Sequence, residues 1–175
     1  TTPPPANAGP YSIPMSRPTA PGPVEPLPAP KRFVSKRAIT VKGQRIAYTA
    51  IAGETWLYNR AAEPIGSIFS FSYLKDGPAK EAGGDPKRPV LFVFNGGPDS
   101  SSLWLHMGVV GPRRVVLDQE VNPSNTPPFG VADNPHSLID MADLVFIDPV
   151  GTGWSRVIGK GATADFWGVD EDADS

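Results

Sequence analysis

The chain has 175 residues, and its 16 basic and 18 acidic side chains leave a formal charge of −2. This even balance gives no reason to expect nucleic acid or a membrane as a partner, and the apolar runs are far too short to cross a bilayer. Cysteine is absent, which excludes disulfides, thiolate catalysis and thiolate zinc sites.

The first predicted segment is rich in proline. Residues 1–30 hold half of the chain's 22 prolines. Proline fixes φ and lacks an amide donor, so we expect this stretch neither in a helix interior nor in a central strand. We predict a disordered tail or linker over residues 1–34; a ligand for an aromatic-groove domain is the alternative. Residues 35–175 are then enough for one domain.

The next segment predicts antiparallel, partly exposed strands. From Arg37 onward, β-branched and aromatic residues surround a Lys42-Gly43 turn, which predicts a hairpin with a third strand near 55–58. Residues 66–74 alternate apolar residues with serines, which is typical of a further strand. Turn formers and charges then mark an exposed connection over 75–89.

Two later strands are of another kind. The runs "PVLFVFN" and "DLVFIDPV" are apolar without polar alternation, which is typical of parallel strands that are buried on both faces. Each ends in a glycine-rich loop, and a helix is predicted over 103–109. The fold class is therefore α/β, with antiparallel lead-in strands followed by parallel core strands. Ligands bind beyond the carboxyl ends of such strands.

The loop after the first of these strands reads "NGGP", residues 95–98. Glycine allows close approach of the backbone to a ligand, and successive amides in such a turn form a concave anion site. In α/β-hydrolases a loop at this place supplies one oxyanion-hole amide. A tight turn without a ligand is the other interpretation of the same residues.

The order of the motifs resembles the serine carboxypeptidase family of α/β-hydrolases. The resemblance lies in "FVFNGGPDSSSLWLHMGVVGP", "DNPHSLIDMADLVFIDPVGTGWSR" and "DFWGVDEDADS", and it covers roughly residues 35–175. Many members carry Cys at the position of Ser100, so this chain is similar to a disulfide-poor, bacterial-like branch. The resemblance implies the N-terminal portion of an α/β-hydrolase fold.

The resemblance also implies site residues. Asn95 and the Gly96 amide would bind the C-terminal carboxylate of a peptide substrate, and the Gly97 amide would be half of the oxyanion hole. Two departures bear on this. The family's loop continues with glycine where this chain has Asp99, whose charge would oppose an oxyanion. A glutamate that often precedes the later Gly-Pro has no counterpart in 108–110.

The loop "DPVGTGWS", residues 148–155, either lines the cleft or only shapes a turn, with Gly151 and Gly153 allowing the turn and Trp154 packing beneath it. The sequence contains no Gly-x-Ser-x-Gly elbow. Its two histidines, His106 and His136, do not match the family's catalytic histidine. The acidic run "DEDADS" copies half of a calcium loop, but acidic residues that open a helix explain it better. We expect no metal and no cofactor.

These observations predict a secreted or periplasmic serine carboxypeptidase that acts through an acyl-enzyme. This chain would supply the oxyanion and carboxylate loop but not the triad, so by itself it is expected to be inactive and poorly stable. Its expected partners are a peptide substrate and the missing C-terminal portion of the same enzyme. The alternatives are an acyltransferase or esterase, and a non-catalytic binding or structural fragment.

Overall fold

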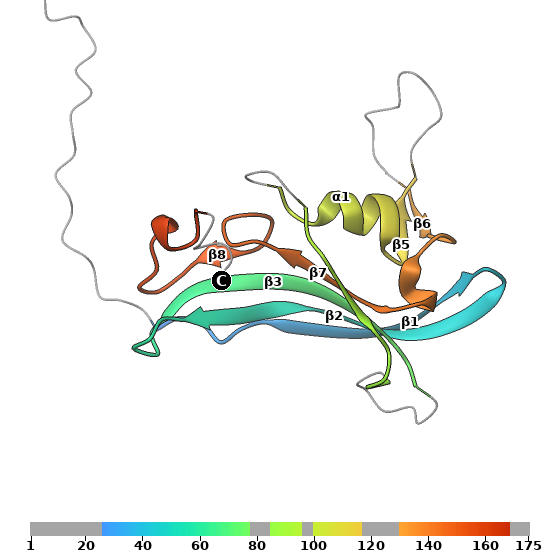
Figure 1. Ribbon diagram of the computed structural model, residues 1–175, viewed down its shortest axis with the longest axis horizontal. Helices are drawn as coiled ribbons and strands as arrows, with labels where there is room; N and C mark the ends of the chain where they lie inside the picture. Colours follow the sequence, from blue (N-terminus) through green and yellow to red (C-terminus); the bar gives the residue numbers. More distant parts are fainter. Residues whose placement is uncertain (1–25, 78–84, 96–99, 117–129, 169–175) are drawn as a thin grey trace, which may run out of the picture.

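A computed structural model describes residues 26–77, 85–95, 100–116 and 130–168. Most of the strands form one mixed sheet in the order β1-β2-β3-β7-β4, with β8 paired to β3 (Figure 1). These strands are β1 (Arg32–Val41), β2 (Gln44–Tyr58), β3 (Pro64–Lys75), β4 (Val90–Val93), β7 (Asp143–Asp148) and β8 (Arg156–Val157). A separate two-stranded sheet pairs β5 (Arg113–Val115) with β6 (Val131–Asp133).

The chain enters the sheet through a long hairpin. Val41 of β1 pairs with Gln44 of β2, and both residues between them have positive φ, 49° at Lys42 and 78° at Gly43. Two consecutive positive φ values match the right-handed twist of the two strands, which confirms the predicted turn. The separate strand expected near 55–58 is wrong, because β2 continues unbroken to Tyr58. Residues 1–25 lie outside the described residues, so the proline-rich tail remains a prediction.

The order of antiparallel and parallel pairs follows the prediction. β3 pairs antiparallel with both β2 and β7, and β4 pairs parallel with β7 from Val90↔Asp143 to Val93↔Phe146. The sheet is thus antiparallel where the chain enters it and ends in one parallel pair.

The predicted burial holds for one of the two apolar strands. Every residue of β7 is buried or half-buried. In β4 only Val93 is buried, and Phe92 is 60 % exposed, so the prediction of burial on both faces is wrong there. The reason is position, because β4 is the last strand in the order and has only β7 beside it among the described strands.

One face of the sheet carries the core, and the helical segments α1 (Leu103–Leu105) and η1 (His106–Val110) lie over this sheet (Figure 1). The buried core residues come mainly from β1, β2 and β7; they are Ile39, Val41, Ile46, Tyr48, Val93, Ile139, Ala142, Leu144 and Phe146. His106 stacks on Phe146 with 4.5 Å between the ring centroids, which fixes the helical segment against the sheet.

The helix predicted over 103–109 is present but changes type. Its first three residues are α-helical, and His106–Val110 form a π-helical turn that ends where the Gly111 amide donates to the His106 carbonyl at 3.1 Å. A side chain at Gly111 would overlap that carbonyl oxygen. No helix within the described ranges is long and apolar enough to cross a membrane.

The Asn-Pro-x-Ser motif closes the end of this helical segment. The side-chain NH₂ of the buried Asn134 donates to the Val109 and Gly111 carbonyls at 2.8 and 2.9 Å. The Ser137 hydroxyl donates to the Val110 carbonyl at 2.9 Å. The last carbonyls of a helix lack partners within it. The motif supplies those partners and leads into the short helix η2 (Leu138–Asp140).

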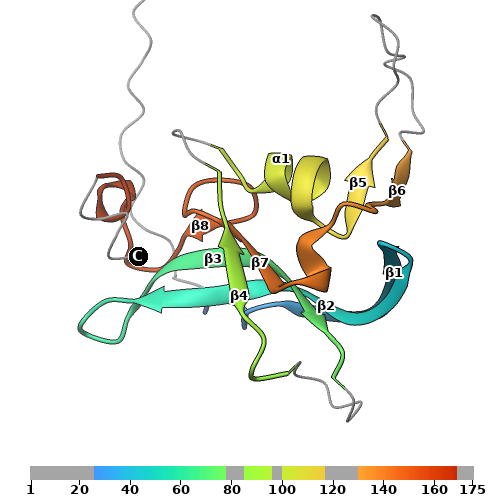
Figure 2. The same ribbon diagram turned by 45° about the vertical axis from the view of Figure 1, so that its right-hand side comes forward.

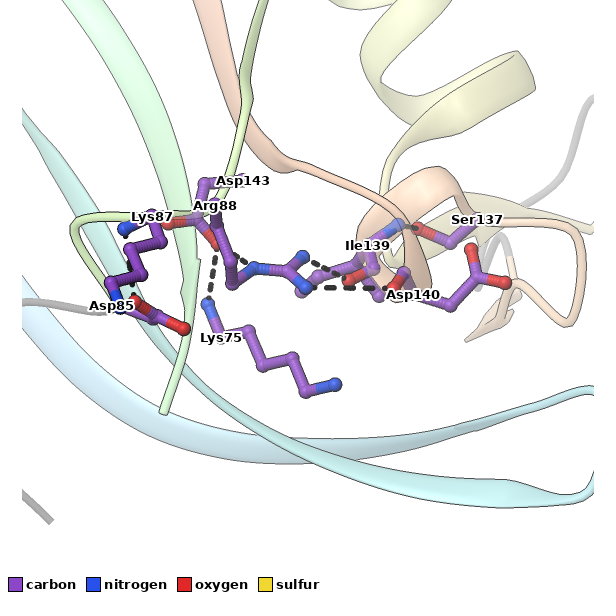
Figure 3. Close-up of polar contacts among 8 residues, drawn as sticks. All are labelled: Lys75, Asp85, Lys87, Arg88, Ser137, Ile139, Asp140 and Asp143. Carbon is purple, nitrogen blue, oxygen red and sulfur yellow. Dashed lines mark hydrogen bonds and ion pairs between the residues drawn. The ribbon is translucent and has the colours of Figure 1, made fainter. Parts of the chain in front are cut away.

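A buried ion pair holds the beginning of β4 beside the beginning of β7 (Figure 3). Arg88 Nε donates to Asp143 Oδ1 at 3.0 Å, and the Lys75 amide donates to the same oxygen at 3.0 Å. Arg88 also donates to the Ile139 carbonyl at 2.8 Å. The two charged side chains are only 14 % and 6 % exposed. One arginine therefore joins β4, β7 and η2.

Replacing Arg88 by alanine should destabilise the protein by about 3–5 kcal/mol, because it leaves the Asp143 carboxylate buried without its charged partner. Arg113→Ala is the matched control. Arg113 pairs with Asp133 at 2.9 Å, but both side chains are about half exposed, and such pairs contribute about 0–1 kcal/mol. Urea denaturation measures both variants. Equal losses for the two would contradict the assigned role of Arg88.

Candidate functional site

The carboxyl ends of β4 and β7 meet at one edge of the sheet. The two strands are parallel and adjacent (Figure 2), so the loop that begins at Asn95 and the loop 149–155 leave the sheet on the same side. Ser102, which follows the first loop, donates to Asp148 at the end of β7 from both its amide and its hydroxyl, each at 2.8 Å. The described ends of the first loop and the loop 149–155 therefore lie at the same edge of the sheet.

Of the three predicted binding residues, the structure describes Asn95. It is half-buried, and its Oδ1 accepts a long hydrogen bond from the Leu105 amide at 3.5 Å. Within the described part of the chain, its Nδ2 donates no hydrogen bond. Gly96 and Gly97 lie outside the described residues, so their roles remain predictions.

Ser102 stands at the start of α1, where it occupies the N-cap position. The Ser102 side chain makes no capping hydrogen bond to its own helix, and its hydroxyl donates to Asp148. Asp99 itself lies outside the described residues.

Asp148 is a buried carboxylate that sequence reasoning missed. It is 2 % exposed, and no lysine or arginine of the described residues forms an ion pair with it. Its Oδ1 accepts the two bonds from Ser102, and its Oδ2 accepts the Trp154 amide at 3.3 Å. A buried charge needs such donors. In the sequence this aspartate stood out only as the first residue of the loop "DPVGTGWS", at the end of an apolar strand.

The loop after β7 is a tight turn built around that carboxylate. Gly151 and Gly153 have φ of 90° and 49°, which confirms the predicted turn. A side chain at Gly153 would overlap the Asp148 carboxylate. The buried Ser155 hydroxyl donates to the Asp148 carbonyl at 2.6 Å and accepts from the Phe69 amide at 2.7 Å. The loop is thereby tied to both β7 and β3.

Trp154 does not pack beneath this loop, so that expectation is wrong. Its side chain is 65 % exposed, and its ring centroid lies 6.4 Å from that of Phe69. The space beneath the loop is occupied by Asp148 and its donors, and the Trp154 amide is one of them. With its backbone turned inward, the indole lies at the surface beside the carboxyl ends of the strands.

The two histidines are not placed as a catalytic base. His136 is exposed in the turn before η2. His106 is buried among Phe71, Tyr73 and Phe146, and its Nε2 lies 2.6 Å from the Tyr73 hydroxyl. Burial lowers the pKa of His106 to about 4, and the Asp148 charge offsets part of this effect. Burial also raises the pKa of Tyr73, so a neutral phenol and a neutral imidazole share this hydrogen bond.

No group of three or more His, Asp or Glu side chains among the described residues is arranged to hold a metal ion. The acidic run at 170–174, for which a calcium loop was the weaker interpretation, lies outside the described residues.

Comparison with known proteins supports the family resemblance. Residues 79–165, about half of the chain, match the Peptidase_S10 family model, whose description is serine carboxypeptidase. No curated protein matches the chain. The matched segment begins before β4 and ends at the last residue of the short helix η3 (Thr163–Asp165), so it contains both loops of the shared sheet edge.

The neutral, buried His106 should make stability depend on pH. Its pKa is lower in the folded protein than the usual value of about 6.5 in the unfolded chain, so its contribution is present above pH 6.5 and is lost as the pH falls toward 4. The full loss is about 3 kcal/mol. In His106→Phe, the decrease in unfolding free energy between pH 6.5 and pH 4 should be smaller by about that amount.

Urea denaturation at several pH values measures this difference, and the carboxylates common to both proteins cancel. Tyr73→Phe is the control, because it keeps the imidazole and removes only its hydrogen-bond partner. It should lower stability by about 1 kcal/mol and retain the pH dependence. The same pH dependence in wild type and His106→Phe would contradict the assignment.

Proposed function

Because residues 79–165 belong to the serine carboxypeptidase family, we propose that the full-length protein is a serine-type carboxypeptidase. It releases C-terminal residues from peptides through an acyl-enzyme. The observation that carries this proposal is the shared edge of β4 and β7, where Ser102 is bound to Asp148 directly after the Asn-Gly-Gly-Pro loop. Ser102, at the end of this loop, is thereby held to β7, and an oxyanion hole requires donors on a fixed scaffold.

In this proposal the loop does two things. The Gly97 amide donates to the oxyanion of the tetrahedral intermediate, and one such donor contributes about 3 kcal/mol to transition-state stabilisation. The Gly96 amide and the Asn95 side chain bind the C-terminal carboxylate of the peptide. The side-chain oxygen Oδ1 of Asn95 accepts the Leu105 amide, which leaves the side-chain NH₂ as the donor to a substrate.

The scaffold we propose is the N-terminal part of an α/β-hydrolase fold. The mixed sheet with its parallel pair β4–β7 is compatible with that fold. β4 has β7 on one side only among the described strands, and Phe92 and Val90 are exposed on it. We assign this uncovered strand to contact with a C-terminal portion that carries the nucleophile, because the sequence of this chain contains no Gly-x-Ser-x-Gly elbow.

A second activity is favoured by one sequence feature. The family's glutamate near the later Gly-Pro would assist carboxylate recognition, but residues 108–110 read Gly-Val-Val, and Val109 is exposed. An esterase or acyltransferase uses the same oxyanion loop and has no need of a free substrate carboxylate.

The full-length protein should hydrolyse a blocked dipeptide and react with a fluorophosphonate at one serine, whereas residues 1–175 alone should do neither. The reason is that oxyanion donors cannot replace a nucleophile and its base. Product release and mass spectrometry of the labelled protein measure both. Labelling of a serine within residues 1–175, or an inert full-length protein, would refute the proposal.

Asn95→Ala in the full-length protein should separate the two activities. Loss of a hydrogen bond to a charged group costs about 1.5–3 kcal/mol, so kcat/KM should fall about tenfold to a hundredfold for a peptide with a free C-terminal carboxylate. Hydrolysis of the corresponding C-terminal amide or ester should change little, and this substrate is the internal control. An equal decrease for both substrates would show that Asn95 does not bind the carboxylate.

A further inference from the structure

Asp148 binds two segments that follow different strands. Its Oδ1 accepts the amide and the hydroxyl of Ser102, which follows the loop after β4. Its Oδ2 accepts the amide of Trp154, in the loop after β7. Both Asp148 and Ser102 are almost fully buried, so water does not compete for these bonds. The carboxylate therefore fixes the separation of the two loops.

Ser102 directs both of its donors toward this carboxylate. A serine at an N-cap position ordinarily accepts a hydrogen bond from an amide one turn into its own helix. Ser102 makes no such bond, and its hydroxyl and amide both lie 2.8 Å from Asp148 Oδ1. A side chain on β7 thus holds the residue from which α1 begins.

The loop between β4 and α1 is consequently held at both ends. At its beginning, Val93 pairs with Phe146 in the parallel ladder. At its end, Ser102 is bound to Asp148. Residues 94–101 have to span the distance between these two fixed points. Any movement of Ser102 relative to β7 changes that distance.

We propose that Asp148 is a positioning residue for the reaction, acting through Ser102 on the oxyanion amide of Gly97. This inference rests on the proposed function, because it takes the role of Gly97 from there. Asp148 touches no reacting atom. It sets the place of the loop relative to the sheet, and a misplacement of about 1 Å can reduce the rate of a reaction on the order of a hundredfold.

Asparagine cannot replace Asp148 without a conflict. All three groups bound by the carboxylate are donors, whereas an amide has one accepting oxygen and one donating nitrogen. Asp148→Asn therefore leaves the size of the side chain unchanged but places its NH₂ against Ser102 or against the Trp154 amide. Ser102→Ala is a milder change, because it removes one of the two bonds to Oδ1 and keeps the amide.

Ser155→Ala is the matched control. Ser155 is as buried as Ser102 and lies in the loop after β7, next to Trp154. Its hydroxyl donates to the Asp148 carbonyl and accepts from the Phe69 amide. No hydrogen bond of this side chain joins it to a described residue between β4 and α1. Its loss should lower stability and leave the geometry of the oxyanion loop in place.

The experiment measures kcat and KM of the full-length protein on one peptide substrate. In Asp148→Asn, kcat should fall about tenfold to a hundredfold while KM stays within about twofold; in Ser102→Ala the decrease in kcat should be smaller but in the same direction. Ser155→Ala should keep kcat within about twofold. Equal decreases in kcat for all three variants would overturn the proposal, since Asp148 would then act only through stability.

Amide hydrogen exchange provides a readout that does not depend on activity. In Asp148→Asn and in Ser102→Ala, the amides of residues 95–102 should exchange at least about tenfold faster than in wild type, and in Ser155→Ala they should not. Ser102→Ala keeps the test decisive if Asp148→Asn does not fold. Unchanged exchange in Ser102→Ala would overturn the positioning role. An inactive wild-type protein with the expected exchange pattern would instead refute the proposed function alone.

Discussion

A carboxylate that is buried without a cation has to be surrounded by hydrogen-bond donors, because an uncompensated charge in the interior costs several kcal/mol. Asp148 meets this requirement with the amide and hydroxyl of Ser102 and the amide of Trp154. The requirement shapes the surroundings. Position 153 must be glycine because a side chain there would overlap the carboxylate, and the Trp154 indole lies outside because its backbone faces inward.

The opposite end of β7 also carries a buried carboxylate that is surrounded by donors. β7 begins with Asp143 and ends with Asp148, and both are buried. Asp143 binds Arg88, which precedes β4, whereas Asp148 binds Ser102, which follows it. The residues before and after the short strand β4 are thus bound to β7, in addition to the parallel pairing of the two strands. This arrangement holds an exposed strand at the end of the sheet in its parallel register with β7.

The helical segment between Ser102 and β5 is fixed by polar contacts at its end and by ring stacking at its centre. Asn134 and Ser137 bind the carbonyls at its end, and His106 stacks on Phe146 at its centre. Leu105 donates to Asn95 from within the same segment. The segment therefore links the predicted carboxylate-binding residue to the core of the sheet.

Local backbone rules predicted the parts of the fold that depend on neighbouring residues. The Lys42-Gly43 turn and the positive φ of Gly151 and Gly153 follow from such rules, and the apolar runs predicted the parallel pair. An apolar run does not reveal the place of a strand in the sheet, so the exposure of Phe92 was missed.

Contacts between residues far apart in sequence were also beyond these rules. The bond between Ser102 and Asp148 joins residues 46 positions apart, and no periodicity or motif marks it. The inward backbone of Trp154 depends on where the Asp148 side chain points, which no pattern in the sequence indicates. Of the candidate site, Asn95 was found from the glycine loop and the family resemblance, whereas Asp148 required the structure.

The proposed function requires the loop that ends at Ser102 to be the oxyanion loop of a serine carboxypeptidase. A crystal structure of the full-length protein after reaction with a fluorophosphonate would show whether it is, because the phosphoryl oxygen of the adduct stands in for the oxyanion. We expect this oxygen about 2.7–3.1 Å from the Gly97 amide nitrogen, with Ser102 still bound to Asp148. An adduct whose oxygen points away from Gly97 would rule out the oxyanion role of this loop.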